Sequence, residues 1–290
     1  MSVTERTTCR GCGAAAFVPI LSLGNLYRSD FIDLSESGAT DANRERLRGP
    51  LDLVRCGVCH LVQLRHTLSR AAIYRQYWFR SNTNDTMRSW LKDVVEGACK
   101  FVDLQPNDAV LDIGANDGTM LGFYPRNIRR VGIEPASNLT IGWSSSGLMT
   151  DVINDLFPHV GFQPYTTSDG TYKVITSIAQ FYDVEDPHAF LADIKRCLAP
   201  DGVFVVQQNY LGAMLQSHGF DNLDHEHLCY YNLKTLEYLF RSEGLCIFDV
   251  AFNEVNGGSF RVYARHRWGD ERPEIHETIE SESWMSDPQT

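Results

Sequence analysis

Two pairs of cysteines near the N-terminus have the spacing of metal ligands. Cys9 and Cys12 are separated by Arg-Gly, and Cys56 and Cys59 are separated by Gly-Val. Two intervening residues let both thiolates of a pair reach one tetrahedral ion, and the second pair completes its coordination. Four thiolates leave no position open for a substrate. This pattern predicts a structural zinc site, in preference to a redox pair or to unrelated buried thiols.

A glycine-bearing loop in the middle of the chain has the composition of a nucleotide-binding turn. Residues 110–118 read Val-Leu-Asp-Ile-Gly-Ala-Asn-Asp-Gly, so an apolar stretch runs directly into the loop. The spacing differs from the G-x-G-x-x-G that places a dinucleotide pyrophosphate at a helix N-terminus. The carboxylates of Asp112 and Asp117 are poor neighbours for a phosphate, but they suit the cationic methionine end of S-adenosylmethionine (SAM).

A second carboxylate position supports the same ligand. Glu134 stands sixteen residues beyond the loop, at the end of the next expected strand, where it can accept both ribose hydroxyls. We therefore predict that SAM, in preference to NAD, is bound by Asp112, Gly114, Asn116, Asp117, Gly118 and Glu134.

The densest group of titratable side chains is Asp224, His225, Glu226 and His227. It follows the expected parallel strand at 203–206, at the edge where open α/β sheets place substrate chemistry. A histidine with an ordinary pKa near 6.5 is a natural general base at neutral pH. The same residues could instead bind a metal through the His-x-His spacing, or form a polar loop without chemistry. The local sequence leaves these three interpretations open.

The composition is that of an ordinary globular chain with an acidic balance. Of the 290 residues, 43% are hydrophobic and 22% are charged, and the net charge is −11. Nucleic-acid binding needs a surplus of Lys and Arg, so this charge argues against such a partner. No stretch approaches the roughly 18 apolar residues of a membrane span, and the first residues lack a secretory signal. We expect a cytoplasmic chain with reduced cysteines and a small-molecule substrate.

Short apolar segments alternate with helical patterns in the second half of the chain. The expected strands cover 109–113, 130–133, 173–178, 203–206 and 246–250, with an antiparallel last strand at 259–265. Helices are expected over 187–198, ended by Pro-Asp-Gly at 200–202, and over 233–242. The succession predicts an α/β fold, a doubly wound, mostly parallel sheet of the class I SAM-methyltransferase type.

Four parts follow from these patterns. We expect a zinc-binding domain at 1–70 and a SAM-binding domain at 104–266. Between them, residues 71–103 form a connector with a substrate-covering aromatic segment and a helix that Asn84 or Asp85 caps. Residues 267–290 are expected to be an acidic tail without a core of its own.

Segments spread over nearly the whole chain match one known family. They are Leu-Val-Gln-Leu at 61–64 after the second cysteine pair, Leu-Asp-Ile-Gly-Ala-Asn-Asp-Gly-Thr at 111–119, Gly-Ile-Glu-Pro-Ala at 132–136, Leu-Ala-Pro-Asp-Gly-Val at 198–203, His-Glu-His-Leu at 225–228 and Gly-Gly-Ser-Phe-Arg-Val-Tyr at 257–263. On these segments the chain resembles the sugar-nucleotide C-methyltransferases of deoxysugar pathways, which act on carbon 3 of a 4-keto-6-deoxyhexose. The segments at 225–228 and 257–263 are far more specific than the glycine loop.

The resemblance implies a reaction and assigns the histidine cluster. His227 would take the proton alpha to the ketone, supported by Glu226, and the resulting enolate would attack the methyl group of SAM. If residues 225–227 are extended, His225 shares a face with His227 and reaches the substrate as well. Two alternatives stay open: an O- or N-methyltransferase of another small molecule, and a non-catalytic partner subunit that binds SAM and zinc.

Three features depart from the family pattern. Asp224 stands where the family has a tyrosine, and Arg-Ser-Asn at 80–82 stands where its covering loop has Tyr-Ser-Ser. The family also carries a C-terminal domain that helps to hold the nucleotide, and it would begin near the last residue of this chain. We expect either a fragment of a longer protein or a smaller substrate.

Overall fold

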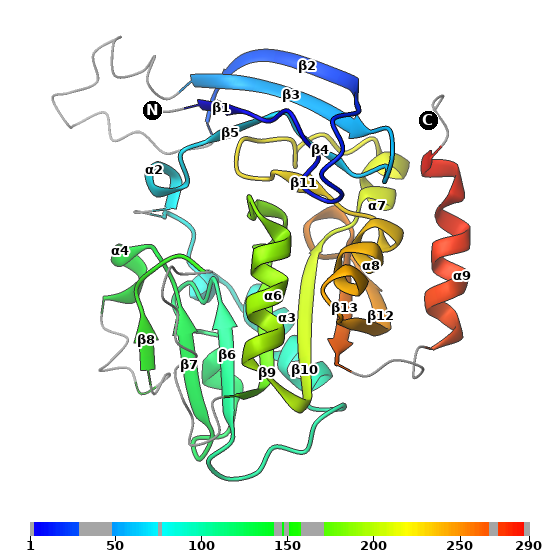
Figure 1. Cartoon of the computed structure of the whole chain (residues 1–290). Helices are drawn as coiled ribbons and strands as arrows, with labels where there is room; N and C mark the ends of the chain where they lie inside the picture. The colour runs from blue at the N-terminus through cyan, green and yellow to red at the C-terminus, as the bar shows by residue number, and fades with distance from the viewer. Residues whose placement is uncertain are drawn as a thin grey trace, which may run out of the picture.

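The computed structural model describes residues 3–28, 48–74, 77–141, 147, 151–157, 171–266 and 272–286. Its centre is a seven-stranded sheet in the order β12-β13-β10-β9-β6-β7-β8 (Figure 1). The strands are β6 (Ala109–Ile113), β7 (Arg129–Ile133), β8 (Asp151–Ile153), β9 (Tyr172–Ile178), β10 (Leu198–Asn209), β12 (Cys246–Asn253) and β13 (Ser259–Arg265). Strand β13 is antiparallel to both neighbours, while β6 to β10 pair in parallel. The predicted α/β sheet and its antiparallel last strand are therefore confirmed.

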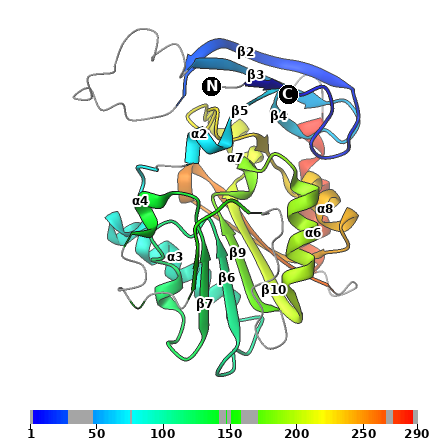
Figure 2. The same ribbon diagram turned by 60° about the vertical axis from the view of Figure 1, so that its left-hand side comes forward.

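Helices cover both faces of this sheet, and the strand sequences explain why. Helix α3 (Asp85–Ala98) lies on one face, and α6 (Pro187–Cys197) and α8 (Leu233–Ser242) lie on the other (Figure 2). Successive strand residues point to opposite faces, so Val110 packs in the core under α3 and Leu111 packs in the core under α6 and α8. Helix α3 begins as predicted, because the Asn84 side chain accepts a hydrogen bond from the Met87 N–H at 2.8 Å.

A second, four-stranded sheet has the order β11-β4-β3-β2. Strands β2 (Phe17–Tyr27), β3 (Arg48–Cys56) and β4 (Val62–Leu64) come from the N-terminal part of the chain, and β11 (Cys229–Tyr230) directly follows the His-Glu-His-Leu segment. Strand β1 (Val3–Glu5) pairs with β5 (His66–Leu68), and α2 (Arg70–Tyr74) follows. This sheet lies over the carboxyl ends of the parallel strands (Figure 1).

Shorter elements complete the fold. They are α4 (Ser137–Thr140), α7 (Leu211–Ser217), α9 (Pro273–Ser281) and the 3₁₀ turns η1 (Ser81–Thr83), η2 (Leu121–Phe123), η3 (Phe181–Asp183), η4 (Val255–Gly257) and η5 (Glu282–Ser286). None of the helices in the described ranges is long and apolar enough to cross a membrane.

One expectation needs correction. Pro-Asp-Gly at 200–202 does not separate helix from strand, because β10 already begins at Leu198 and shifts its register against β9 before Val203.

The described part of the acidic tail packs on the large domain. Ile275 and Met285 are buried, and the Glu282 carboxylate accepts hydrogen bonds from the Leu233 and Lys234 N–H groups, which are free at the start of α8. Residues 267–271 and 287–290 of that tail lie outside the described residues.

Candidate active site and metal centre

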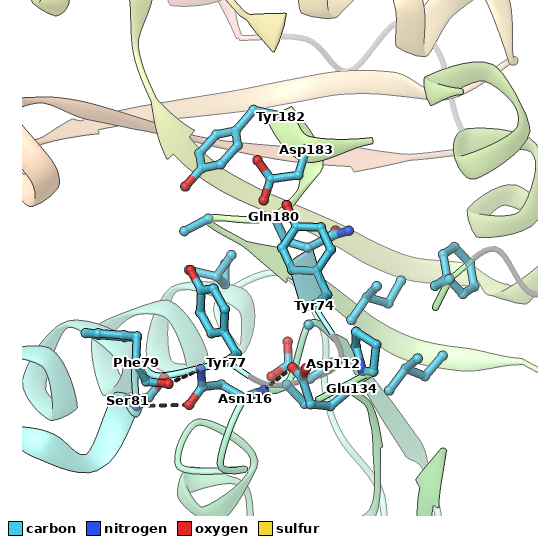
Figure 3. Close-up of a pocket in the computed structure, with 18 of the residues that line it drawn as sticks. Tyr74, Tyr77, Phe79, Ser81, Asp112, Asn116, Glu134, Gln180, Tyr182 and Asp183 are labelled. Carbon is cyan, nitrogen blue, oxygen red and sulfur yellow. Dashed lines mark hydrogen bonds between the residues drawn. The ribbon is translucent and has the colours of Figure 1, made fainter. Parts of the chain in front are cut away.

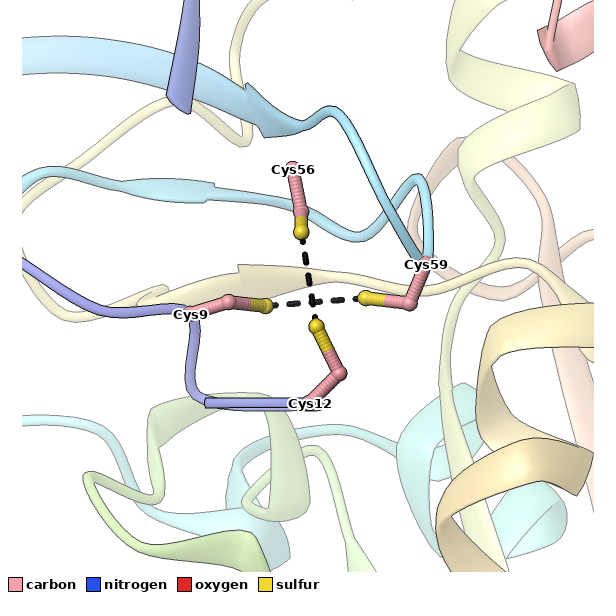
Figure 4. A group of neighbouring side chains, drawn as sticks. All are labelled: Cys9, Cys12, Cys56 and Cys59. Carbon is pink, nitrogen blue, oxygen red and sulfur yellow. Dashed lines mark hydrogen bonds between the residues drawn. The ribbon is translucent and has the colours of Figure 1, made fainter. Parts of the chain in front are cut away.

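The four predicted cysteines converge on one point. Their Sγ atoms all lie within 4.8 Å of one another, and Figure 4 shows them aimed at a common centre. Cys9 and Cys59 are 3.6 Å apart, and Cys12 and Cys56 are 3.5 Å apart. Four sulfurs in this arrangement match the closed tetrahedral set of a structural zinc site.

Nearby N–H donors prepare the sulfurs for a cation. The Gly11 and Val58 N–H groups donate to the Sγ atoms of Cys9 and Cys56, and the Gln63 side chain donates to Cys9 at 3.1 Å. The hydrogen bond from the neighbouring Cys59 thiol contributes most to lowering the pKa of Cys9, to about 4, and the same contact raises the pKa of Cys59; the Gln63 and Gly11 donors lower the pKa of Cys9 further. Hydrogen bonds of this kind stabilise a thiolate, which is the form that binds zinc.

The metal centre is attached to the rest of the chain through a buried arginine. Arg10 lies between the first two cysteines, and its guanidinium donates to the Leu64 carbonyl at 2.6 Å and to the Thr67 hydroxyl at 2.7 Å. It also forms an ion pair with Glu185, 3.2 Å away. Glu185 lies just after η3, in the loop that follows the carboxyl end of β9. The ion pair therefore ties the first cysteine pair to the carboxyl edge of the large sheet.

A cavity of about 430 Å³ lies at that edge, between the two sheets (Figure 3). Strands β6, β7 and β9, the connector and the loop at 221–227 contribute to its wall. Five of the predicted site residues line it: Asp112, Gly114, Asn116, Glu134 and His227. The other four, Asp117, Gly118, His225 and Glu226, lie outside the lining.

Two buried carboxyl groups mark one end of the cavity. Glu134 accepts hydrogen bonds from the Asn116 N–H at 2.9 Å and the Ala136 N–H at 2.8 Å, and Asp112 accepts one from the Thr176 hydroxyl at 2.7 Å. Burial raises the pKa of Glu134 to about 7 and that of Asp112 to about 7. Each carboxylate oxygen has two lone pairs, so Glu134 keeps acceptor capacity for ligand hydroxyls.

The side chains of Asn116 and Asp117 hydrogen-bond to the backbone of the connector, a role that the sequence did not indicate. The Asn116 side chain accepts from the Ser81 N–H at 3.0 Å and donates to the Phe79 carbonyl at 3.0 Å. The Asp117 side chain accepts from the Asn82 N–H at 2.9 Å. Both therefore fasten the aromatic connector over the cavity, and Gly118 serves the turn with its positive φ of 77°.

His227 is held with a defined tautomer beside the cavity. Its Nδ1 lies 2.8 Å from the Asn222 carbonyl oxygen, and its ring meets the Tyr182 ring edge-on with centroids 4.3 Å apart. A carbonyl oxygen only accepts, so Nδ1 carries the proton and a neutral ring has its lone pair on Nε2.

The neighbouring histidine is directed elsewhere. The Asp224 carboxylate accepts hydrogen bonds from the Glu226 and His227 N–H groups, which turns the backbone so that 225–227 is not extended. His225 is buried with its Nε2 3.0 Å from the Gly49 carbonyl of β3. It therefore links the loop to the N-terminal sheet, and the shared face expected for the two histidines is not present.

The metal interpretation of the histidine cluster receives no support from the geometry. In the part of the chain that the structure describes, the cysteines form the only group of metal-type ligands. Glu226 instead accepts a hydrogen bond from the Tyr77 hydroxyl at 3.4 Å.

The segment at 257–263 has a supporting role. Gly257 and Gly258 have positive φ angles of 79° and 119° and turn the chain into β13. Arg261 bonds to Gln207 at 2.8 Å and to Asp93 of α3 at 2.8 Å. The motif thus holds α3 on the sheet.

Other lining residues escaped the sequence analysis: Arg70, Gln180, Tyr182 and Asp183. The last three follow β9, so their position after an expected strand was the available signal. Tyr74 and Tyr77 also line the cavity, from α2 and the connector.

The fold and the site are those of the methyltransferase family, with a zinc-binding domain at the N-terminus. Residues 80–249 match the family described as "Methyltransferase domain", and the chain belongs to it. Residues 9–74 match the family described as "Putative zinc binding domain", which confirms the four-cysteine zinc site as predicted. A SAM-dependent methyltransferase from Clostridium acetobutylicum has the same fold, with a TM-score of 0.50 and 13% identity over 63% of this chain and 92% of that one.

The names of two related proteins specify the type of methylation. Over 277 residues the chain is 30% identical to the C-methyltransferase NovU of Streptomyces niveus, which covers 94% of this chain and 64% of NovU. A stretch of 118 residues is 31% identical to sphingolipid C9-methyltransferase A of Emericella nidulans, covering 38% of this chain and 22% of that protein. The chain thus spans less than two thirds of the length of these relatives.

SAM affinity should depend on Glu134 and on pH for one physical reason. A cationic ligand favours ionised carboxylates, and those of Glu134 and Asp112 become ionised only near pH 7. We expect the affinity to rise between about pH 6 and about pH 8 and then to level off. A charged hydrogen bond contributes about 1.5–3 kcal/mol, so Glu134→Ala should weaken binding about ten- to a hundred-fold at the higher pH. Calorimetry with SAM over this pH range measures both the pH dependence and the loss in the Glu134 variant. An unchanged affinity in that variant would place the ribose of SAM elsewhere.

Proposed function

We propose that this chain is a C-methyltransferase that acts on a 4-keto-deoxysugar nucleotide, at the carbon alpha to the ketone, with His227 as the base. The observation that carries the proposal is the His227 imidazole on the cavity wall, with Nδ1 engaged by the Asn222 carbonyl. Its neutral form has Nε2 available as a proton acceptor.

Proton removal would come first and methyl transfer second. Nε2 of His227 takes the proton, the C–H electron pair becomes the carbon–carbon double bond of an enolate, and the carbonyl π pair moves to oxygen. SAM supplies the methyl group when it is bound. The enolate carbon would then form the new C–C bond to that methyl group as the bond from the methyl group to sulfur breaks and its electron pair stays on sulfur. The ketone is restored, and His227 keeps the proton until it passes to water.

Asp112 and Glu134 are the residues that we propose for SAM. Burial makes each of these charges costly, and a cationic ligand beside them would offset that cost. The connector, held by Asn116 and Asp117, would exclude water from the ligand.

Two observations support the carbon substrate and the sugar nucleotide. NovU is described as a C-methyltransferase, and the aligned region covers nearly all of this chain. The His-Glu-His-Leu and Gly-Gly-Ser-Phe-Arg-Val-Tyr segments are typical of enzymes that act on keto-deoxysugar nucleotides. We include a cytoplasmic location in the proposal, because none of the eight cysteines forms a disulfide and a reducing compartment keeps cysteines in that state.

The test is incubation of the protein with a panel of 4-keto-6-deoxyhexose nucleotides in deuterated water, with and without SAM. C-methylation predicts deuterium at the alpha carbon without SAM, and one added methyl group in its presence. A methylated product without exchange would indicate O- or N-methylation instead. Neither exchange nor methylation with any member would favour a partner subunit.

A further inference from the structure

Asp183 is a buried acid on the cavity wall with an unused oxygen. It ends η3, directly after the tyrosine that contacts the His227 ring, and only 7% of its surface is exposed. Its Oδ1 is buried and has no hydrogen-bond partner among the described residues. An unpaired buried polar atom carries a desolvation cost, so its place in a binding cavity suggests that a ligand pairs with it.

The Tyr74 hydroxyl is in the same situation. It is buried, it has no hydrogen-bond partner within the described ranges, and it comes from α2, at the start of the connector. Figure 3 shows the Tyr74 hydroxyl and the Asp183 carboxyl pointing toward each other. Two chain segments about a hundred residues apart thus present two unused polar groups to one place.

The charges around Asp183 favour its neutral form. Burial raises its pKa well above the usual range, and the Glu226 and Asp224 carboxylates raise it further. The nearby Tyr74 hydroxyl, which can donate a hydrogen bond to the carboxylate, opposes this effect most, followed by the Arg70 guanidinium. Tyr77 and Tyr182, which also interact with Asp183, have raised pKa values themselves. A neutral carboxyl group is a hydrogen-bond donor, whereas a carboxylate only accepts.

We propose that Asp183, as a carboxylic acid, and the Tyr74 hydroxyl donate hydrogen bonds to the substrate oxygen that becomes negative when His227 removes the alpha proton. This inference rests on the proposed function. Proton removal moves an electron pair onto the ketone oxygen, and that charge needs donors already in place. The His227 base and the Asp183 donor line the same cavity, where Tyr182 contacts the imidazole and Asp183 is the next residue of η3. Asp183 keeps its proton throughout, so no further acid or base is required.

The fold explains how this acid is held in place. The Asp183 N–H donates to the Gln180 carbonyl at 3.0 Å, which closes η3. Two residues later Glu185 pairs with Arg10 of the metal centre. A fixed donor of this kind costs no reorganisation during the reaction.

The first measurement is the protonation state of Asp183 in the full chain, by carboxyl NMR or infrared spectroscopy at about pH 7. We expect a protonated carboxyl signal that disappears in Asp183→Asn. A carboxylate signal at this pH would overturn the proposal, since an ionised Asp183 would repel the developing charge.

The second measurement is deuterium exchange into a 4-keto-6-deoxyhexose nucleotide without SAM. Loss of one such donor lowers rates about a hundred- to a thousand-fold, which we expect for Asp183→Ala, and Tyr74→Phe should act in the same direction. Asp183→Asn keeps a donor and should lose less than about tenfold. The exposed Asp103→Ala is the matched control, and zinc content and SAM affinity report folding.

The outcomes separate the two proposals. Normal exchange by Asp183→Ala, or equal losses in the Ala and Asn variants, would refute the donor role and leave the C-methyltransferase standing. If the unaltered chain exchanges no member of the panel, the proposed function fails, and the enolate donor fails with it.

Discussion

Replacing His227 by asparagine should lower the rate of methyl transfer by about a hundred- to ten-thousand-fold, the size expected for removal of a general base. Asparagine keeps a polar side chain and can still donate to the Asn222 carbonyl, but it cannot accept a proton at neutral pH. Zinc content and SAM affinity should stay unchanged, because the cysteines and Glu134 lie on other elements. Turnover, metal analysis and calorimetry on the same preparation test all three.

Two histidine variants serve as controls for this substitution. His225→Asn removes the hydrogen bond to the Gly49 carbonyl, so we expect a loss of stability of about 1 kcal/mol with a milder effect on rate. His218 is exposed and has a positive φ of 53°, which asparagine tolerates. The His218→Asn variant should therefore transfer methyl groups at the normal rate. If the His227 variant keeps more than about a tenth of the rate, the base lies elsewhere.

Removing the metal should abolish catalysis although no cysteine lines the cavity. Cys56→Ser leaves three thiolates, and the free energy of structural zinc binding, about 10–16 kcal/mol in small peptides, is largely folding free energy. The N-terminal sheet should therefore unfold locally. The active-site loop depends on that sheet, because β11 pairs with β4 and the Leu64 N–H donates to the Leu228 carbonyl at 2.9 Å.

Cys56→Ser should affect turnover and SAM binding differently. Turnover should fall to background, while SAM affinity should change less than about tenfold, since Asp112 and Glu134 lie at the ends of β6 and β7. Metal analysis should find one zinc per chain, lost in Cys56→Ser and retained in the exposed Cys99→Ser control. A second stoichiometric ion, lost when His225 and His227 are changed, would instead make the histidine cluster a metal site.

The Asp224 position shows why family patterns need the structure beside them. A tyrosine there would have a hydroxyl to offer, whereas Asp224 uses one carboxylate oxygen to accept the N–H groups of Glu226 and His227. The carboxylate therefore shapes the loop that presents His227. Its charge also acts on Asp183, whose pKa it helps to raise.

Sequence alone determined the features whose geometry is local. Two residues between cysteines fix the distance between two thiolates, and a strand that runs into glycines fixes a turn at a sheet edge. The alternation of apolar segments with helical patterns likewise defined the strand-helix succession, since each period reflects a backbone repeat of a few residues. The zinc ligands, the cavity residues Asp112 and Glu134, and the antiparallel β13 were accessible in this way.

Tertiary structure decided everything that depends on partners distant in sequence. It separated His227 from His225, turned Asn116 and Asp117 toward the connector, and brought Tyr74 next to Asp183. It also added β11 to the N-terminal sheet, which links the zinc centre to the active-site loop. The physical reason is that a polar side chain takes its role from the atoms packed around it, and residues more than a hundred positions apart become neighbours only when the two sheets close over the cavity.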